Sequence, residues 1–245
     1  ITNEVGGIID TDDDVFSVDS SSDISGAITN SGTITAGYSV FFVRSAADVS
    51  GTITNEVGGI MTAVEPVFSI NPNATISGNI TNSGIIRGED DVFSLDSRGT
   101  ISGNITNSGT ITAGDNVFSL ENPGATISGN ITNEVGGIIQ AGSDAFSVNN
   151  GSTISGNITN EVGGIIQAGD DGFFVGETST ISGAIINRGI IEAGDDAFYL
   201  EDSSTISGAI TNSGTIEAGD NAFWVDTSST ISGAITNSGT IEAGD

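Results

Sequence analysis

Aspartates recur at one position of the sequence, just before a repeated Phe, and they are the side chains best suited to chemistry. These candidate ligands are Asp13, Asp14, Asp90, Asp91, Asp115, Asp170, Asp171, Asp195, Asp196 and Asp220. Carboxylate oxygens are hard ligands of the kind that calcium prefers, whereas Asp and Asn also form turns through hydrogen bonds to the backbone. The cluster therefore predicts either a calcium site or a column of stacked acidic turns. No cofactor is required, although calcium is a candidate.

Carboxylate pairs can also act as general acid and base in glycoside hydrolysis, and many parallel β-helices are enzymes of that kind. Here the pair recurs in several units without a distinctive neighbour, as turn residues do. The chain has no Cys and no His, and its four basic residues are all Arg. Thiol and Lys nucleophiles, His acid or base catalysis and Cys/His zinc sites are thereby excluded. We expect that the protein is not an enzyme.

Aromatic residues break the repeat at the position after the recurring Phe. Five units have Ser there, and the others have Phe42, Phe174, Tyr199 and Trp224. Alternation along a strand turns these rings outward, and the outward neighbour two residues earlier is expected to be the small Gly172, Ala197 or Ala222 in the last three units. An apolar stripe on a solvent face is typical of a contact surface. We expect a protein contact, sugar stacking, or local packing against a loop.

The repeat that must position these residues is the triplet Ile-Thr-Asn, or Ile-Ile-Asn once, which opens a unit every 25 to 27 residues. Each unit contains three short segments of alternating apolar residues, separated by Gly, Asn, Asp and Ser. Such a unit cannot bury its apolar faces alone, but stacked units can. The sequence predicts an all-β fold, a three-faced parallel β-solenoid with one unit per coil. Residues 1–245 are expected to be one array of nine full repeats and a partial tenth, without terminal caps.

Two residue types recur at fixed offsets and are predicted to form ladders through the array. An internal column of stacked rings is expected from Phe16, Phe41, Phe68, Phe93, Phe118, Phe146, Phe173, Phe198 and Phe223. Asn at the third position of a unit either adopts left-handed backbone geometry or pairs its amide with the next coil; these residues include Asn30, Asn55, Asn82, Asn107, Asn133, Asn160, Asn187 and Asn212. Turns with the sequence Glu-Val-Gly-Gly add two residues and explain the longer spacings.

The charge of the chain limits its partners. With 32 acidic and four basic residues, the formal net charge is -28. Nucleic acids and anionic membranes are bound through basic patches, so we expect no nucleic acid partner and no membrane insertion of this segment. A flat outward row of small polar residues, such as Ser102, Asn104 and Thr106, is compatible with lateral packing or, less well, with ice binding.

The run Ile-Ser-Gly-Asn-Ile-Thr-Asn-Ser-Gly-Thr-Ile-Thr-Ala-Gly at residues 101–114 resembles the repeats of bacterial autotransporter-type passenger regions and of other large surface β-solenoid proteins. The resemblance extends over the whole chain but contains no diagnostic motif. It implies an exported, right-handed solenoid at the bacterial cell surface. The function expected is therefore that of an extracellular structural protein, which forms or decorates a filament or matrix by self-association. The alternative is an adhesin that binds a surface glycan or protein through the aromatic stripe.

Overall fold

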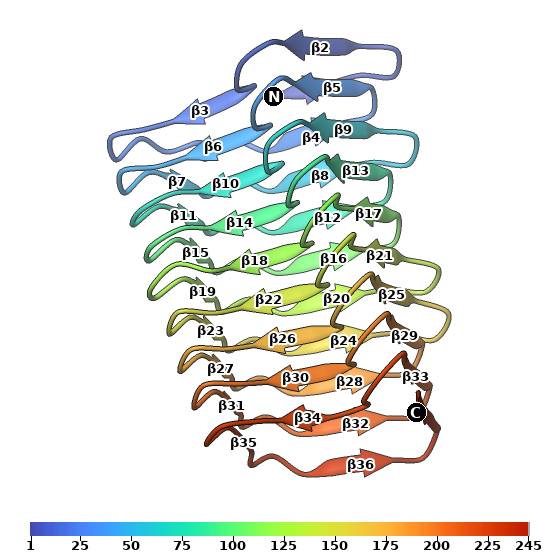
Figure 1. Ribbon diagram of the computed structural model, residues 1–245. Coiled ribbons are helices and arrows are strands. Elements are labelled where there is room, and N and C mark those ends of the chain that lie inside the picture. Colours follow the sequence, from blue (N-terminus) through green and yellow to red (C-terminus); the bar gives the residue numbers. More distant parts are fainter. Residues whose placement is uncertain (245) are drawn as a thin grey trace.

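The computed structural model describes residues 1–244 and contains a single stack of parallel coils (Figure 1). The eight complete coils each run through four strands, one in each of four parallel sheets, which we name sheets A, B, C and D in the order in which a coil visits them. The predicted fold class is confirmed, but a coil has four sheets and not three. No helix in the described part of the chain has the length and apolar character needed to span a bilayer.

Sheet A contains the Ile-Thr-Asn triplets, in which Ile and Asn face inward and Thr faces outward. Its ten strands are β1 (Thr2–Asn3), β4 (Ile28–Asn30), β8 (Ile53–Asn55), β12 (Ile80–Asn82), β16 (Ile105–Asn107), β20 (Ile131–Asn133), β24 (Ile158–Asn160), β28 (Ile185–Asn187), β32 (Ile210–Asn212) and β36 (Ile235–Asn237).

Sheet B follows the first turn of each coil and buries every second side chain, as at Ile111 and Ile139. Its ten strands are β2 (Ile8–Thr11), β5 (Thr33–Ala36), β9 (Ile60–Ala63), β13 (Ile85–Gly88), β17 (Thr110–Thr112), β21 (Ile138–Gln140), β25 (Ile165–Ala168), β29 (Ile190–Ala193), β33 (Thr215–Ala218) and β37 (Thr240–Ala243).

Sheet C contains the recurring Phe, which faces the core with the aliphatic residue two positions later. Its nine strands are β3 (Phe16–Val18), β6 (Phe41–Val43), β10 (Phe68–Ile70), β14 (Phe93–Leu95), β18 (Phe118–Leu120), β22 (Phe146–Val148), β26 (Phe173–Val175), β30 (Phe198–Leu200) and β34 (Trp224–Val225).

Sheet D closes the coil with two-residue strands. They are β7 (Asp48–Val49), β11 (Thr75–Ile76), β15 (Thr100–Ile101), β19 (Thr126–Ile127), β23 (Thr153–Ile154), β27 (Thr180–Ile181), β31 (Thr205–Ile206) and β35 (Thr230–Ile231). The prediction of three segments in each unit was wrong at this point, because the chain bends at the Ser-Gly between sheets D and A and divides one predicted segment into two strands. A Cβ on Gly208 would lie 1.8 Å from the carbonyl oxygen of Gly183, so this bend requires Gly in coil after coil.

Equivalent residues of neighbouring coils are paired, and the register does not slip along the array. Asn107 pairs with Asn133 in sheet A, Phe118 with Phe146 in sheet C and Ile127 with Ile154 in sheet D. The two extra residues of a Glu-Val-Gly-Gly turn are absorbed between sheets A and B, where Thr110 pairs with Ile138. The variable turn therefore leaves the core unchanged.

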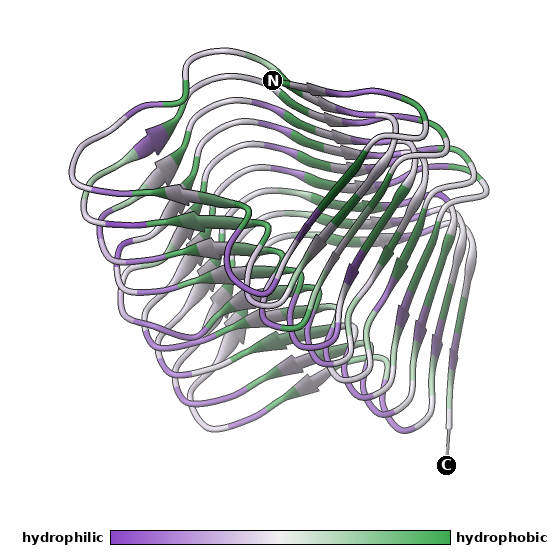
Figure 2. Ribbon diagram, turned by 90° about the horizontal axis from the view of Figure 1, so that it is seen from above, coloured by the Kyte–Doolittle hydropathy of each residue, from purple (hydrophilic) through white to green (hydrophobic). Residues whose placement is uncertain are grey.

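The core is a continuous column of buried Ile, Val, Leu, Ala and Phe side chains. Consecutive Phe rings of sheet C stack with centroids 4.7–5.0 Å apart, as between Phe118 and Phe146 at 4.7 Å. Hydrophobic segments (green) lie in and beside the strands of every sheet, and hydrophilic segments (purple) recur in the turns (Figure 2). The seven inner rings, Phe41 to Phe198, are fully buried and have a stacked ring on both sides, whereas the terminal Phe16 and Phe223 have one stacked neighbour each and are half-buried.

The Asn side chains at the ends of the sheet A strands form a second internal ladder. Asn133 Nδ2 donates to Asn160 Oδ1 at 2.9 Å, and Asn107 Nδ2 donates to Asn133 Oδ1 at 2.8 Å. The same side chains donate to main-chain carbonyls in the turn and in the next coil, and Asn133 is 1% exposed. Within the described residues, every buried side-chain N or O atom has a hydrogen-bond partner.

Candidate functional site

The acidic corner lies in the turn between sheets B and C, where it forms two files with different surroundings. The inner file includes Asp14, Asp91, Asp144, Asp171 and Asp196. A carboxylate oxygen of each accepts the backbone N–H of the equivalent residue one coil later, over 2.8–3.0 Å. The inner file is therefore a ladder that joins successive coils, with hydrogen bonds that run between turns and not within one turn.

Burial changes the acidity of the inner file. Asp91 and Asp171 are each 8% exposed. Removal from water raises the pKa of Asp91 to about 7, that of Asp144 to about 7 and that of Asp171 to about 6, although the accepted N–H partly opposes the change. The neighbouring carboxylates of both files raise these pKa values further, by repulsion. Part of the inner file is consequently protonated near neutral pH.

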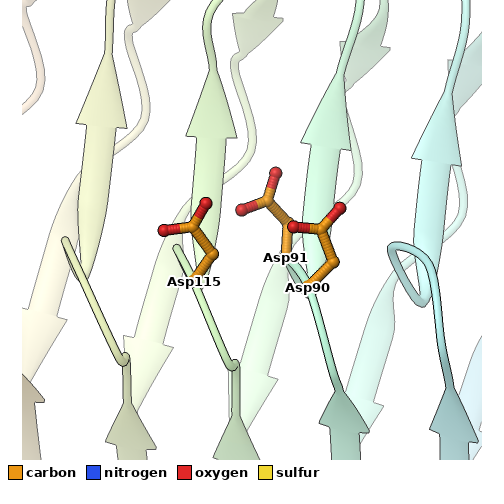
Figure 3. A group of neighbouring side chains, drawn as sticks. All are labelled: Asp90, Asp91 and Asp115. Carbon is orange, nitrogen blue, oxygen red and sulfur yellow. The ribbon is translucent and has the colours of Figure 1, made fainter.

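The outer file consists of Asp13, Asp90, Asp115, Asp170, Asp195 and Asp220, which precede the inner position in their turns. Asp90 and Asp91 come from one turn and Asp115 from the next, and one carboxylate oxygen from each lies within 4.8 Å of the others (Figure 3). Within residues 1–244 this is the one such group of three acidic side chains. Calcium binding at this group stays a prediction. One oxygen of Asp91 accepts the N–H of Asn116 at 3.0 Å, and its second oxygen is the one left for a cation.

The aromatic residues of the predicted stripe all occupy outward positions of sheet C, and three of them lie in consecutive coils. The Phe174 and Tyr199 centroids are 5.5 Å apart in an edge arrangement, and those of Tyr199 and Trp224 are also 5.5 Å apart. Tyr199 donates its hydroxyl hydrogen to Glu201 at 2.7 Å, which raises the pKa of the phenol to about 12. The Trp224 side chain is 46% exposed.

Phe42 lies apart from the other three, with Ser17 and Ser69 beside it in the sheet. The guanidinium of Arg44 lies 5.0 Å from its ring centroid and also pairs with Asp19 at 3.1 Å. A Phe beneath a cation is a favourable arrangement, so this ring has a local packing partner. The stripe therefore consists of Phe174, Tyr199 and Trp224, and Phe42 is not part of it.

The prediction that small outward residues flank the stripe was wrong. Ala197 is fully buried in the core, as are the Val residues at the same position of other coils, such as Val92. Gly172 is also buried. Strands of sheet C begin at the Phe, and the chain bends at the residue before it, so the alternation does not continue backwards. Both the residue before the Phe and the Phe itself therefore face inward.

Exposed aliphatic side chains on the corner between sheets A and B were not recognised from the sequence. The Val of each Glu-Val-Gly-Gly turn projects into solvent, with Val57, Val135 and Val162 exposed by 82%, 73% and 64%. Outward Ile residues such as Ile138 and Ile165 follow them in sheet B. The signal was the Ile-Ile doublet, since only one of two consecutive strand residues can face the core.

A comparison with known protein families matches only the coils that contain a Glu-Val-Gly-Gly turn. The family model described as the MELT motif matches residues 1–14, 53–66, 131–144 and 158–171, less than a quarter of the chain. These are the four segments with a Glu-Val-Gly-Gly turn. No curated protein and no solved structure matches the chain. The chain is therefore a β-solenoid repeat protein, and four of its coils contain segments similar to the MELT motif.

Proposed function

We propose that this protein is an extracellular structural protein, whose stiff repeat rod forms or decorates a filament or matrix at a bacterial cell surface. The observation that carries the proposal is the unbroken register of all four sheets, with Phe and Asn ladders running through every coil. At about 4.8 Å per coil, ten coils extend over roughly 45 Å. Each added unit lengthens such a rod without altering its core.

The rod should resist bending because the Phe and Asn ladders connect every coil to the next. A bend would open the Phe stack on one side and stretch the amide hydrogen bonds of the inner Asn residues, which are 2.8–2.9 Å long. Closely packed interiors resist such distortion. A spacer or filament subunit needs this property, whereas a binding module does not.

Electron microscopy of the purified full-length protein, with calcium and with a chelator, tests the proposal. We expect straight rods that assemble into fibres or sheets. Antibodies against the protein should label these assemblies on the surface of intact cells. Fibres only with calcium would support the Asp90, Asp91 and Asp115 group as an assembly site, and fibres in both conditions would assign the acidic corner to turn formation. Isolated rods in both conditions would refute the filament.

The second candidate is an adhesin, and the file of Phe174, Tyr199 and Trp224 favours it. Aromatic rings in a row at 5.5 Å spacing suit stacking against sugar rings or a protein strand. Replacing Tyr199 and Trp224 by Ala should then abolish adhesion while the rod remains folded by circular dichroism. Replacing the isolated Phe42 by Ala is the matched control, and equal losses of adhesion in both variants would refute a role of the file.

A further inference from the structure

A surface pocket lies in the first three coils, where the turns between sheets B and C meet the outward face of β6 and β10 (Figure 1). Its volume is about 370 Å³, and its lining includes Asp13, Asp14, Tyr38, Phe42, Glu65 and Ser69. Pockets that bind small ligands have volumes of about 300–1,000 Å³. This pocket is therefore large enough for one side chain or for a molecule of similar size.

The pocket coincides with a departure from the repeat. The acidic pair of the corner, as in Asp90-Asp91, is replaced by Tyr38-Ser39 in the second coil and by Glu65-Pro66 in the third. The second coil also has Phe42 at the outward position of sheet C, where both neighbouring strands have Ser. Large rings beside small residues leave a hollow at the surface, so these departures explain the position of the pocket.

Three carboxylates border the pocket, and no basic side chain lines it. Asp13 and Glu65 are exposed, and Asp14 is half-buried. Neither of the two ion pairs in residues 1–244 involves any of the three. One oxygen of Asp13 and one of Asp14 accept backbone N–H groups, over 2.9 and 3.0 Å, which leaves each of them a second oxygen. Three like charges around one hollow repel one another, and a bound cation offsets that repulsion.

Two aromatic rings complete the pocket. Tyr38 is 54% exposed and Phe42 is half-buried, and the face of an aromatic ring attracts a cation. The adjacent surface already shows this combination, because the guanidinium of Arg44 lies 5.0 Å from the ring centroid of Phe42 and pairs with Asp19 at 3.1 Å. Arg44 does not line the pocket. The hollow therefore offers rings and carboxylates to a cation from another molecule.

The lining distinguishes a cation from other ligands. An ammonium or guanidinium group contains only hydrogen-bond donors, and ionised carboxylates contain only acceptors. A neutral sugar needs donors as well as acceptors, and the side chains that can donate here are the hydroxyls of Tyr38, Ser39 and Ser69. An anion would be repelled by all three carboxylates. A cation on an apolar stem matches the acceptors, the charge and the aromatic surface together.

We propose that this pocket binds the side chain of a Lys or Arg that a basic partner protein presents to the rod. A second copy is a poor occupant, because the chain has four Arg and no Lys, and two copies with a net charge of -28 repel each other. Charge complementarity selects a partner with an excess of basic residues. The proposal goes beyond the structural function of the rod, and neither depends on the other.

Titration of the isotope-labelled protein, followed by NMR, tests the proposal. The probe is the peptide acetyl-Gly-Lys-Gly-amide, with butylammonium chloride as the isolated side chain and acetyl-Gly-Gln-Gly-amide as the neutral control. We expect chemical-shift changes at the backbone amides of Tyr38, Phe42 and Glu65, with a dissociation constant of about 1 mM for a contact made by one side chain. Raising NaCl from about 0.05 to 0.5 M should weaken binding about threefold or more.

Variants separate the pocket from the general charge of the rod. Tyr38→Ala removes one ring and should weaken binding about threefold, whereas Tyr38→Phe keeps the ring and should bind nearly as tightly as the parent protein. Glu65→Gln should weaken binding about twofold or more. The matched control is Glu217→Gln, which removes the same charge from an exposed position of β33, outside the pocket, and should leave binding unchanged. Circular dichroism establishes that the variants are folded.

Four results would overturn the proposal: no shift changes with the Lys peptide, equal changes with the Gln peptide, changes dispersed along the whole acidic corner, or binding that Tyr38→Ala leaves unchanged. Binding of butylammonium without binding of the peptide would also overturn it, because the pocket would then accept a free cation but not the side chain of a protein. None of these results would affect fibres in the electron microscope, so the proposed function is tested separately.

Discussion

Replacing one buried Asn of the sheet A ladder should destabilise the protein far more than replacing an exposed Asn of the same coil. Asn133 donates to Asn160 Oδ1, to the carbonyl of Gly137 at 2.9 Å and to that of Ile165 at 3.0 Å. Asn133→Ala leaves these acceptors without that donor in a buried site. At about 1–3 kcal/mol for each unsatisfied buried group, we expect a loss of about 3–5 kcal/mol in the free energy of unfolding.

Asn130 is the matched control in the same coil. It is exposed, and its Oδ1 accepts only the backbone N–H of Asn157, at 3.0 Å. Other coils have Ala at this position, as at Ala184 and Ala209. Since water can replace the lost acceptor, Asn130→Ala should cost less than about 1 kcal/mol.

Thermal unfolding followed by circular dichroism compares the two variants with the parent protein. A loss of 3–5 kcal/mol corresponds to a fall of roughly 6–20 °C in melting temperature for a chain of this length. The isosteric Asn133→Asp separates hydrogen bonding from size, because a buried carboxylate accepts but cannot donate, and it should be least stable at high pH. Equal melting temperatures for the Asn133 and Asn130 variants would refute the reasoning.

Three further predictions concern stability. Asp91 and Asp144 have pKa values raised by burial to about 7, so the folded chain binds more protons than the unfolded chain between about pH 4 and 7; its melting temperature should rise as the pH falls from about 8 to 5, and a fall would contradict the assigned burial. Phe118→Ala removes a fully buried ring that stacks on both sides and should cost about 3–5 kcal/mol in urea unfolding, whereas a cost near 1 kcal/mol would show that the column is not tightly packed. A Cβ on Gly156 would lie 1.9 Å from a carbonyl oxygen of the preceding coil, whereas one on Gly26 meets nothing within 4 Å; Gly156→Ala should therefore lower stability by about 2 kcal/mol or more, and similar melting curves for the two Ala variants would argue against the close approach.

The fold was predictable because the repeat supplies the same information ten times. An apolar residue at a fixed offset, such as Phe118, identifies the core face without any knowledge of the chain path. The number of sheets was harder to predict. Ile206 and Ile210 both face inward, as one continuous strand would place them, and the bend between them is visible only from the close approach of Gly208 to Gly183.

The candidate surfaces were predictable only where alternation is unbroken. Tyr199 lies within a strand and faces outward as expected, whereas Ala197 precedes the strand and escapes the rule. The distinction between inner and outer carboxylates, such as Asp171 and Asp170, depends on the curvature of a turn, which spacing does not encode. The exposure of Val135 was not predicted, because Val is usually a buried residue and spacing does not show that a turn projects it into solvent.

The Asn ladder also gives the rod an electrical direction. In every coil Nδ2 of the earlier Asn donates to Oδ1 of the later one, from Asn3 to Asn237, so the amide dipoles point the same way and reinforce one another. Ten aligned amides of about 3.5 D each sum to a moment on the order of 30 D along the axis. Two rods that lie side by side are therefore favoured to run in opposite directions, an arrangement that a two-fold axis perpendicular to the rods provides.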